Sequence, residues 1–544
     1  MTYKDLADLI FPNIKHDISY YEEKYPQRNL KEGTIVTRYA PSPTGFVHIG
    51  ALLASFTGYS FAKQSDGVFF LRIEDTDTKR TVENGISKII KDLSDFNITF
   101  TEGAISEDEE NGNYGPYIQS KRKEIYQTFI KHLIIEGKAY PCFLTEEELS
   151  SMRERQEKYK ERIGCYGKYA KYRDIELEEA AQRIKNGDAY IIRLKSPGSF
   201  YKKIKCNDLV RGTLEFPEND LDIPIMKKDG LPTYHFAHLV DDHLMHTTHV
   251  IRADEWISSL PIHLQLFEVF NFKAPKYAHI SRLLKNDNGQ IRKLSKRKDP
   301  ECAVSFYHEM GIPNEAVKLY LATIINSNFE EWYLQNKEKS IKDFEFSFKK
   351  VSKSGALFDL EKLNNISKTY ISRLNKDDLY IQTVKYLEEF DLEFLRIFTS
   401  NPDYTKEILN IEREQKKPRK DIGKYSDVKN QIWFMYDELF PNAWENNNIE
   451  IDMLLDYMNN YYEETDDKNT WFNKIAQFGA DNNYATVKEY KDNPDIFKGH
   501  IGDICEMLRY AITSLTMTPD LYEVMRILGK ARILKRLETY KNKK

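Results

Sequence analysis

The sequence has few cysteines, no long apolar segment and no large excess of charge of either sign. Five cysteines scattered over 544 residues cannot form a disulfide framework, which favours a reducing compartment. No apolar run approaches the roughly 18 residues that span a bilayer, and the first residues contain acids rather than the apolar core of a secretory signal. The formal charge of −5 gives no global basic character, so a bound nucleic acid would have to be held by local basic patches. These absences predict a cytoplasmic protein with no membrane partner.

The segment from Thr34 to Ala51 reads T-I-V-T-R-Y-A-P-S-P-T-G-F-V-H-I-G-A. Its β-branched start, Thr34 to Arg38, predicts a short strand, and the two prolines that follow end that strand abruptly. From His48 onward apolar residues recur at helical spacing, so a helix is predicted directly after the turn. A helix N-terminus fed by a loop that contains Gly45 presents free N–H groups and suits a phosphate. An ordinary strand-to-helix turn in an α/β domain is the alternative for this stretch considered alone.

A second strand follows this helix. Gly67 is expected to end the helix, and Val68 to Ile73 then predicts a buried strand. Glu74 opens the string E-D-T-D-T-K-R, which ends at Arg80. Because substrates of a parallel α/β sheet bind beyond the carboxyl ends of its strands, Glu74 and Arg38 are expected at the same edge. Taken alone, clustered acids after a strand more often form a solvated loop or a helix cap.

The rest of the chain carries further local signals. Asp229 and Gly230 predict a hairpin turn, and Tyr234 to Val240 predicts a helix or strand that faces the sheet edge. A basic string, K-L-S-K-R at Lys293 to Arg297, follows a segment expected to be flexible, Lys285 to Gln290. A lone basic pentamer is usually a solvated loop. After about residue 345 strand signals are sparse, which predicts a helical C-terminal part.

Three strings together resemble the signatures of class I aminoacyl-tRNA synthetases, in the form that the glutamyl branch has. They are R-x-A-P-S-P-T-G-x-x-H-I-G from Arg38, R-I-E-D-T-D-x-x-R from Arg72, and K-L-S-K-R from Lys293. The class signature H-I-G-H ends here in Ala51, a departure that the glutamyl branch commonly shares. A second H-I-G at His500 is expected to lack both a preceding strand and the proline turn, so the three letters alone carry little weight.

The resemblance implies an α/β fold of six segments. It predicts a class I synthetase Rossmann-like catalytic domain with an inserted acceptor-binding domain and an all-α C-terminal anticodon-binding region of bacterial type. The predicted segments are an N-terminal extension (1–33), the first half of the catalytic domain (34–139), the inserted acceptor-end-binding domain (140–210), the second half of the catalytic domain (211–275), the K-L-S-K-R loop and stem-contact region (276–345), and the helical anticodon-binding region (346–544). Many family members hold zinc in the insertion. Here the stretch before Arg173 supplies only Cys142 and Cys165, too few for four ligands, so no structural zinc is predicted.

The resemblance also implies where ATP binds. The expected catalytic residues are His48, which donates to the phosphates, and Lys293 and Lys296, which neutralise charge on the departing oxygens. The expected ATP-binding residues are His48, Ile49, Gly50, Leu294, Ser295 and Lys296. Mg²⁺ is expected to arrive with ATP and to bridge its phosphates, and no dedicated protein metal site is predicted.

A glutamate substrate brings two carboxylates and an ammonium, which demand two cationic partners and at least one anionic partner. Arg38, Arg252 and Glu74 supply that set. The residues that the resemblance assigns to glutamate are Arg38, Ala40, Ser42, Glu74, Tyr234, His238 and Arg252. At position 238 the family more usually has Asn. Which arginine takes the side-chain carboxylate stays open at this point.

The implied activity is that of a glutamate–tRNA ligase, which activates L-glutamate with ATP and transfers it to tRNA(Glu), here as a monomer. One alternative is a glutaminyl-tRNA synthetase, which Glu74, Asp77 and Arg252 and the helical C-terminal half disfavour. Another is a catalytically inactive tRNA-binding paralogue, against which the intact H-I-G and K-L-S-K-R strings argue.

A basic stretch in the C-terminal part is a candidate for RNA contact. Arg413 to Lys424 is rich in basic residues and precedes Trp433, Phe434 and Tyr436. Aromatic rings beside phosphate-binding lysines are how proteins bind unpaired bases. At helical spacing, however, such aromatics more often belong to the core.

Overall fold

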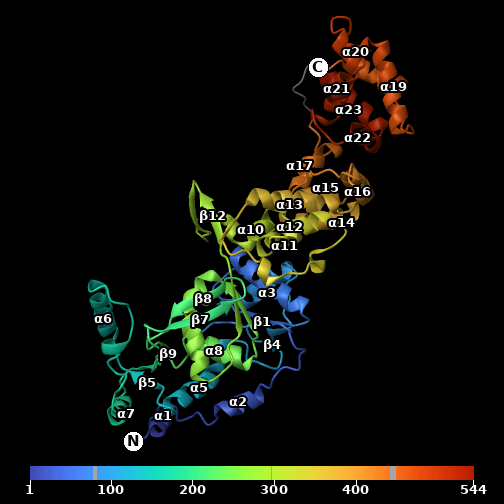
Figure 1. The fold of residues 1–544 in the computed structure, drawn as a ribbon. Helices are drawn as coiled ribbons and strands as arrows, with labels where there is room; N and C mark the ends of the chain where they lie inside the picture. Colours follow the sequence, from blue (N-terminus) through green and yellow to red (C-terminus); the bar gives the residue numbers. More distant parts are fainter. Residues whose placement is uncertain (78–81, 296, 442–448, 544) are drawn as a thin grey trace. The chain divides into compact units, whose positions relative to one another are not determined.

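The computed structural model describes residues 1–77, 82–295, 297–441 and 449–543, and the chain divides into two compact units (Figure 1). Unit 1 consists of Met1–Phe306 and Lys318–Asp359, and unit 2 consists of Tyr307–Val317 and Leu360–Lys544. Among the described helices, none combines the length and the apolarity that crossing a bilayer requires.

A parallel sheet lies at the centre of unit 1. Its strands in order are β1 (Val36–Tyr39), β2 (Val68–Leu71) and β3 (Glu102–Ala104), all parallel, and β4 (Glu110–Asn111), antiparallel to β3. On the other side of β1 lies β10 (His249–Ala253), which pairs in parallel with β11 (Lys276–Ile280). The backbone N–H of Thr248 donates to the carbonyl of Val36 at 2.9 Å and joins the two sets of strands. Since β1 has neighbours on both sides, its carboxyl end is the switch point at which open α/β sheets bind ligands.

Helices cover both faces of this sheet. α3 (Ile49–Gln64) packs on β1, β2 and β10, while α5 (Lys123–Ile135) and α8 (Tyr234–Leu244) share a core with Val36 and Phe70. Side chains alternate along a strand, so Arg38 faces the same side as Val36, toward α8. The other helices of unit 1 are α1 (Tyr3–Ile10), α2 (Ile18–Lys24), α4 (Gly85–Asp95), α6 (Glu146–Lys158), α7 (Leu177–Lys185), α9 (Leu260–Val269) and α12 (Phe329–Gln335).

The predicted strand, turn, helix and strand around β1 are confirmed, but the helix ends for a different reason than expected. Asp66, with φ of 51°, is the residue in the left-handed conformation after α3. Gly67 is required because a Cβ at that position would lie 2.0 Å from the carbonyl oxygen of Ile35. The glycine therefore lets β2 start close beside β1.

Two antiparallel arrangements follow in the middle of the chain. One is a sheet of β5 (Ala139–Cys142), β6 (Ile191–Leu194) and β9 (Pro224–Met226), and the other is a hairpin of β7 (Lys203–Asp208) and β8 (Gly212–Pro217). The expected turn at Asp229 and Gly230 is confirmed, since Gly230 has φ of 79° and donates to the carbonyl of Lys227 at 3.0 Å. Tyr234 to Leu244 is a helix, which settles the choice between helix and strand.

The segment before K-L-S-K-R forms a regular hairpin. β12 (Leu283–Asp287) pairs antiparallel with β13 (Gln290–Lys293) and in parallel with β14 (Ala356–Leu357). Asn288 and Gly289 make the turn with φ of 52° and 89°, values typical of a type I′ turn. The segment from Lys285 to Gln290, which was expected to be flexible, thus has regular strand and turn structure, because Asn288 and Gly289 have the turn chemistry of a hairpin.

Unit 2 is helical, as predicted. α10 (Val304–Glu309) and α11 (Asn314–Ile325) each contain residues of both units. The other helices are α13 (Leu360–Arg373), α14 (Lys376–Phe390), α15 (Leu392–Phe398), α16 (Pro402–Asn410), α17 (Asp427–Ile432), α18 (Ile451–Asn460), α19 (Lys468–Asp481), α20 (Val487–Asp492), α21 (Ile501–Thr513), α22 (Leu521–Leu528) and α23 (Lys530–Lys543). Within the described residues the only strands of unit 2 are the two-residue β15 (Tyr484–Ala485) and β16 (Gly499–His500).

The second H-I-G string does follow a strand, contrary to expectation, because β16 ends at His500 itself. The helix start that it opens is already occupied by a carboxylate: the backbone N–H of His500 donates to the side chain of Asp503 at 2.7 Å. An acid in the first turn thus satisfies the N–H of the N-cap and places a negative charge where a phosphate would bind.

The aromatic residues of the C-terminal part belong to the core of unit 2. Phe434 and Tyr436 are buried there, and Trp433 packs against the same cluster. Arg413 is buried as well and donates to the carbonyl oxygens of Leu409 at 2.9 Å and Ile371 at 2.7 Å. The core interpretation is therefore confirmed for the aromatics, and Arg413 caps backbone groups of this unit.

Candidate active site

A cavity of about 330 Å³ lies at the carboxyl end of β1. Six of the seven predicted glutamate-binding residues line it: Arg38, Ala40, Ser42, Glu74, Tyr234 and Arg252. His48 and Gly50 of the predicted ATP site line it too. Residues that are more than 200 positions apart in the sequence thus meet around one hollow, at the place where the sheet topology predicts a ligand.

The loop after β1 leads directly into the N-terminus of α3. His48 is the N-cap of this helix, and its Nδ1 accepts a hydrogen bond from the N–H of Ala51 at 3.0 Å. Nδ1 is thereby an acceptor, so in the neutral ring Nε2 carries the proton and can donate. The side chain of Ile49 is buried in the core, which leaves its backbone N–H as the group able to meet a phosphate.

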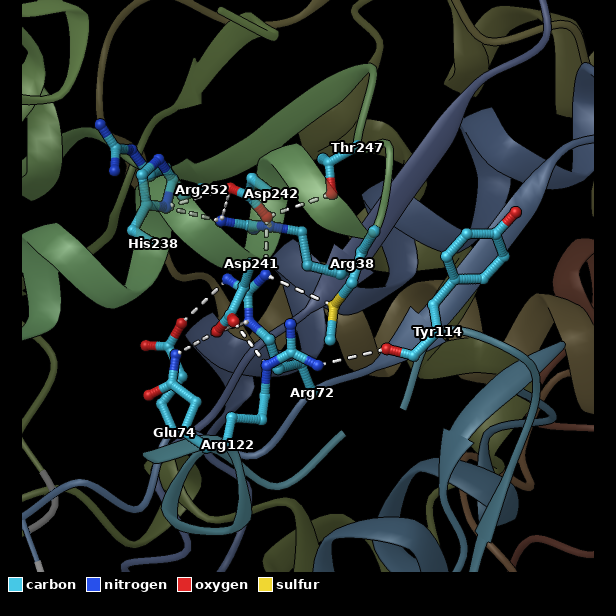
Figure 2. Close-up of polar contacts among 12 residues, drawn as sticks. Arg38, Arg72, Glu74, Tyr114, Arg122, His238, Asp241, Asp242, Thr247 and Arg252 are labelled. Carbon is cyan, nitrogen blue, oxygen red and sulfur yellow. Dashed lines mark hydrogen bonds and ion pairs between the residues drawn. The ribbon is translucent and has the colours of Figure 1, made fainter. Parts of the chain in front are cut away.

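Arg38 is held by a buried carboxylate of α8 that sequence reasoning missed (Figure 2). Its Nε donates to Oδ1 of Asp242 at 3.1 Å, and Arg72 donates to the same oxygen at 2.7 Å. The hydroxyl of Thr247 donates to that oxygen at 3.1 Å. Burial would raise the pKa of Asp242, but Arg38 and Arg72 hold it well below its usual value. Asp242 is therefore a fixed anion that orients two arginines.

A second group of buried charged side chains begins with the arginine that pairs with Glu74. Arg72 is fully buried and donates to Oε1 of Glu74 at 3.1 Å, while Arg122 donates to Oδ1 of Asp241 at 2.7 Å (Figure 2). Tyr126 also donates to Asp241, at 2.9 Å. A charged residue inside the apolar string V-F-F-L-R-I was the sequence signal for Arg72, because a buried arginine needs a carboxylate partner.

Burial raises the pKa of Glu74, although the neighbouring Arg72 and Arg38 act in the opposite direction. The side chain is mostly buried but lines the cavity. A substrate ammonium would favour the ionised form of this carboxylate, so the position suits a cationic group of the ligand.

Arg252 is held in a different way from Arg38, by neutral groups. Its Nε donates to Nε2 of His279 at 2.9 Å, and Nη1 lies 3.2 Å from Nδ1 of His263. Nη1 also lies 3.5 Å from the hydroxyl of Tyr234, and Nη2 donates to the carbonyl of Trp256 at 3.3 Å. Within the described part of the chain no carboxylate pairs with Arg252, so its positive charge stays available at the cavity wall.

His238 lies behind Arg38 and away from the cavity lining. Its side chain is fully buried, with Nδ1 3.1 Å from Oδ2 of Asp242 and Nε2 3.2 Å from the hydroxyl of Tyr277. Its ring stacks on that of His263 with centroids 4.1 Å apart. Burial lowers the pKa of His238 well below its usual value, so the ring is neutral at physiological pH. The predicted direct contact with glutamate stays a prediction, and the geometry connects His238 to the site through Arg38.

The K-L-S-K-R string begins at the end of β13. Nζ of Lys293 lies 2.5 Å from a carboxylate oxygen of Glu255, which itself lines the cavity. Leu294 is buried, and the N–H of Ser295 donates to Asp299 at 2.8 Å. Lys296 lies outside the described residues. The string is therefore tethered to the cavity rim through Lys293 and anchored by Asp299.

Cys142 and Cys165, the two cysteines of the insertion that precede Arg173, are buried, and the thiol of Cys165 donates to the carbonyl of Tyr169 at 3.2 Å. Among the residues that the structure describes, no cluster of three or more His, Cys, Asp and Glu side chains is arranged to hold a metal ion. The expectation that the insertion carries no structural zinc stays a prediction.

Comparison with known proteins shows the family to which the chain belongs. Residues 34–365 match the family model described as tRNA synthetases class I (E and Q), catalytic domain, and residues 392–541 match the model described as anticodon binding domain. The chain belongs to this family of class I tRNA synthetases. The predicted fold class is thereby confirmed: an α/β class I catalytic domain followed by an all-helical anticodon-binding region.

Relatives that match over nearly the full length of the chain show which members of the family it resembles. The chain is 48% identical over 546 residues to a glutamate–tRNA ligase of Clostridium perfringens strain 13, with 99% of this chain and 100% of the relative covered. It is also 48% identical to a glutamate–tRNA ligase of Clostridium beijerinckii, with both chains fully covered. A solved glutamate–tRNA ligase of Elizabethkingia meningosepticum, in complex with its amino acid, is similar with a TM-score of 0.74 and 27% identity and covers 93% of this chain and 98% of its own.

Proposed function

We propose that this chain is a glutamate–tRNA ligase. It activates L-glutamate with ATP to glutamyl-adenylate, transfers glutamate to the 3′ end of tRNA(Glu), and releases AMP and pyrophosphate. The observation that carries the proposal is the cavity at the end of β1, where Arg38, Glu74 and Arg252 converge beside the N-terminus of α3. The full-length relatives named glutamate–tRNA ligase support the same function.

The charges around the cavity favour glutamate over glutamine. Arg38, Arg72 and Arg122 each have a direct carboxylate partner among Glu74, Asp241 and Asp242, whereas the direct partners of Arg252 within the described residues are neutral. The side-chain carboxylate of glutamate can pair with Arg252, while glutamine offers a neutral amide and leaves that guanidinium without an ionic partner at the cavity wall.

The two arginines at the cavity wall differ in whether a carboxylate of the protein already pairs with them. Arg38 is paired with Asp242, while Arg252 is held by neutral partners. An arginine that is not neutralised attracts a carboxylate more strongly in a partly buried site. We therefore assign the substrate's side-chain carboxylate to Arg252 and its ammonium to Glu74, with Ser42 and Tyr234 as hydroxyl partners.

Activation needs no protein nucleophile, because the α-carboxylate of glutamate attacks the α-phosphorus of ATP and pyrophosphate leaves. The protein's part is placement and charge stabilisation. His48 through Nε2 and the backbone N–H groups of Ile49 and Gly50 meet the phosphates. Lys293 and Lys296 neutralise the departing oxygens, and Leu294 and Ser295 complete the ATP site. Mg²⁺ arrives with ATP and bridges its phosphates.

The six sequence segments are part of this proposal, with the insertion at 140–210 meeting the acceptor end of tRNA. The start of the catalytic family match at residue 34 supports the first boundary. We further propose that the enzyme acts as a cytoplasmic monomer. The glutaminyl and inactive alternatives are not favoured, because the full-length relatives are named glutamate–tRNA ligase.

Aminoacylation of purified tRNA(Glu) and tRNA(Gln), each with labelled glutamate and labelled glutamine, tests the proposal. We expect glutamate to be attached to tRNA(Glu) and no charging with glutamine. Lys296→Ala should abolish most adenylate formation and leave tRNA binding nearly unchanged. Lys276→Ala, which removes an exposed lysine at the start of β11, is the matched control and should be as active as the parent. Charging with glutamine alone, or an active Lys296→Ala variant, would overturn the assignment.

A further inference from the structure

Arg252 owes its orientation to two buried side chains that line no part of the cavity. Arg252 and His279 are partners in the parallel pairing of β10 and β11, so their side chains project from the same face of the sheet. Nε of Arg252 donates to Nε2 of His279 at 2.9 Å. On the far side of that ring, Nδ1 of His279 lies 2.7 Å from Oδ2 of Asp208.

Asp208 is an anion fixed by the backbone around it. It is the last residue of β7, and its Oδ1 accepts from the N–H groups of Val210 at 2.9 Å and Arg211 at 2.8 Å. The N–H of His279 donates to Oδ2 of Asp208 at 3.1 Å. Burial opposes ionisation, yet the hydrogen bonds from His279 and the backbone hold the pKa of Asp208 below its usual value. Its carboxylate therefore accepts hydrogen bonds and donates none.

The fixed anion determines the tautomer of His279. Since Asp208 only accepts, Nδ1 of His279 must carry the proton, and in the neutral ring Nε2 is then a pure acceptor. Burial lowers the pKa of His279, which keeps the ring neutral. The ring thus accepts from Nε of Arg252 without placing a negative charge against the guanidinium. This differs from Arg38, whose Nε donates directly to a carboxylate.

We propose that Asp208 and His279 form a positioning dyad that fixes the orientation of Arg252, keeps its charge uncancelled, and so sets the preference for a dicarboxylic substrate. The inference rests on the proposed function and deepens it. With Nε bound to the dyad, the terminal nitrogens of Arg252 meet His263, Tyr234 and the carbonyl of Trp256, of which Tyr234 and Trp256 line the cavity. Asp208 and His279 touch no reactant in this arrangement and act through Arg252.

Three variants test the dyad. His279→Phe removes the acceptor. His279→Gln offers one acceptor and one donor on a single amide, as the N–C–N edge of imidazole does. Asp208→Asn places an amide N–H against Nδ1 of His279 if the backbone keeps its hold on the remaining oxygen, which forces the proton onto Nε2 and turns it toward Arg252. His249→Gln is the control, because His249 is buried on the same strand as Arg252 and its Nδ1 lies 2.8 Å from the hydroxyl of Thr248 instead.

The readout is aminoacylation at saturating tRNA(Glu), with KM measured separately for glutamate and for ATP. We expect His279→Phe and Asp208→Asn to raise the glutamate KM by about tenfold or more, the scale of a lost hydrogen bond to a charged group, while the ATP KM stays within about twofold. The ratio of kcat/KM for glutamate to that for glutamine should fall in parallel. The glutamate KM of His279→Gln should be closer to that of the parent than to that of His279→Phe. The glutamate KM of the control should match that of the parent.

Two results would overturn the dyad. One is a folded His279→Phe or Asp208→Asn protein with an unchanged glutamate KM, and the other is an equal rise of both KM values, as general damage to the fold would give. If His279→Phe does not fold, Asp208→Asn and His279→Gln decide the matter by the same criteria. The activity of the parent enzyme separates this inference from the proposed function. A parent that attaches no glutamate to tRNA refutes the function. An active parent whose variants have an unchanged glutamate KM refutes only the dyad.

Discussion

Asp242 is the residue whose loss should disturb the site most. It is fully buried, and its carboxylate pairs with Arg38 at 3.1 Å and with Arg72 at 2.7 Å. Asp242→Ala removes the negative charge and leaves both guanidinium groups in place. Arg72 keeps Glu74 at 3.1 Å, whereas Arg38 loses its carboxylate partner among the described residues.

The expected cost is large because the abandoned charge stays out of water. Removing one partner of a buried ion pair destabilises by about 3–5 kcal/mol. At 1.4 kcal/mol per factor of ten, local opening of β1 and α8 becomes about 100- to 4,000-fold more frequent. Asp242→Asn keeps the shape and one acceptor oxygen, so its effect should be smaller but of the same sign. The glutamate KM should rise in both variants, since Arg38 lines the cavity.

Local opening of β1 and α8 is best measured by hydrogen exchange resolved to individual peptides. A single melting temperature is less suitable, since a chain of two units need not unfold in one step. Peptides of β1 and α8 should exchange faster in the variants, with peptides of α19 to α23 as the internal reference. Glu215→Ala, which breaks the exposed ion pair with Lys203, is the matched control and should leave exchange unchanged. If exchange in β1 and α8 rises less than tenfold in Asp242→Ala, the network does not stabilise these elements as argued.

Two further predictions concern Glu74 and Arg413. Burial raises the pKa of Glu74 above its ordinary 4.5, so the stability linked to its proton is fully present below pH 4.5 and is lost as pH rises through the raised pKa. Glu74→Gln should remove that step from a series of unfolding free energies against pH and should raise the glutamate KM; an unchanged step would assign it to another group. Arg413→Ala removes the guanidinium donor from the carbonyl of Leu409 and one of the two donors from the carbonyl of Ile371, and should destabilise unit 2 by about 1–3 kcal/mol, measured by hydrogen exchange of α13 and α16. Its tRNA affinity below the melting temperature should match that of the parent, and a tenfold loss would show that Arg413 contacts RNA.

The parts of the fold that were predicted correctly are determined by residues that are close together in the sequence. The strand at β1, the proline turn and the helix start at His48 each follow from propensities within about 18 residues of sequence. The turn at Asp229 and Gly230 is equally local. The hairpin of β12 and β13 was missed although Asn288 and Gly289 carry the turn signal, because Lys285 to Gln290 was expected to be a flexible segment leading into K-L-S-K-R.

The charged network was missed because its members are far apart along the chain. Arg72 and Asp242 are 170 positions apart, and Arg122 and Asp241 are 119 apart. The sequence marks Arg72 only as a charge within an apolar strand. No periodicity or spacing connects it to an acid in α8, since that pairing arises from the packing of a helix on a sheet.

This contrast has a physical basis in how the two substrates are bound. A phosphate needs backbone N–H groups at a helix N-terminus, and a single loop such as the one from Tyr39 to Gly50 provides them, so each half of the proposed ATP site lies in one continuous string, this loop or Lys293 to Lys296. An amino acid with two carboxylates needs buried cations, and each buried cation needs its own partners to stay charged and oriented. Those partners have to come from whichever elements the fold brings alongside, here α8 for Arg38 and the end of β7 for Arg252 through His279. The proposed preference for glutamate is therefore a property of the tertiary structure, even though most of the residues that we propose to contact the amino acid lie within recognisable motifs.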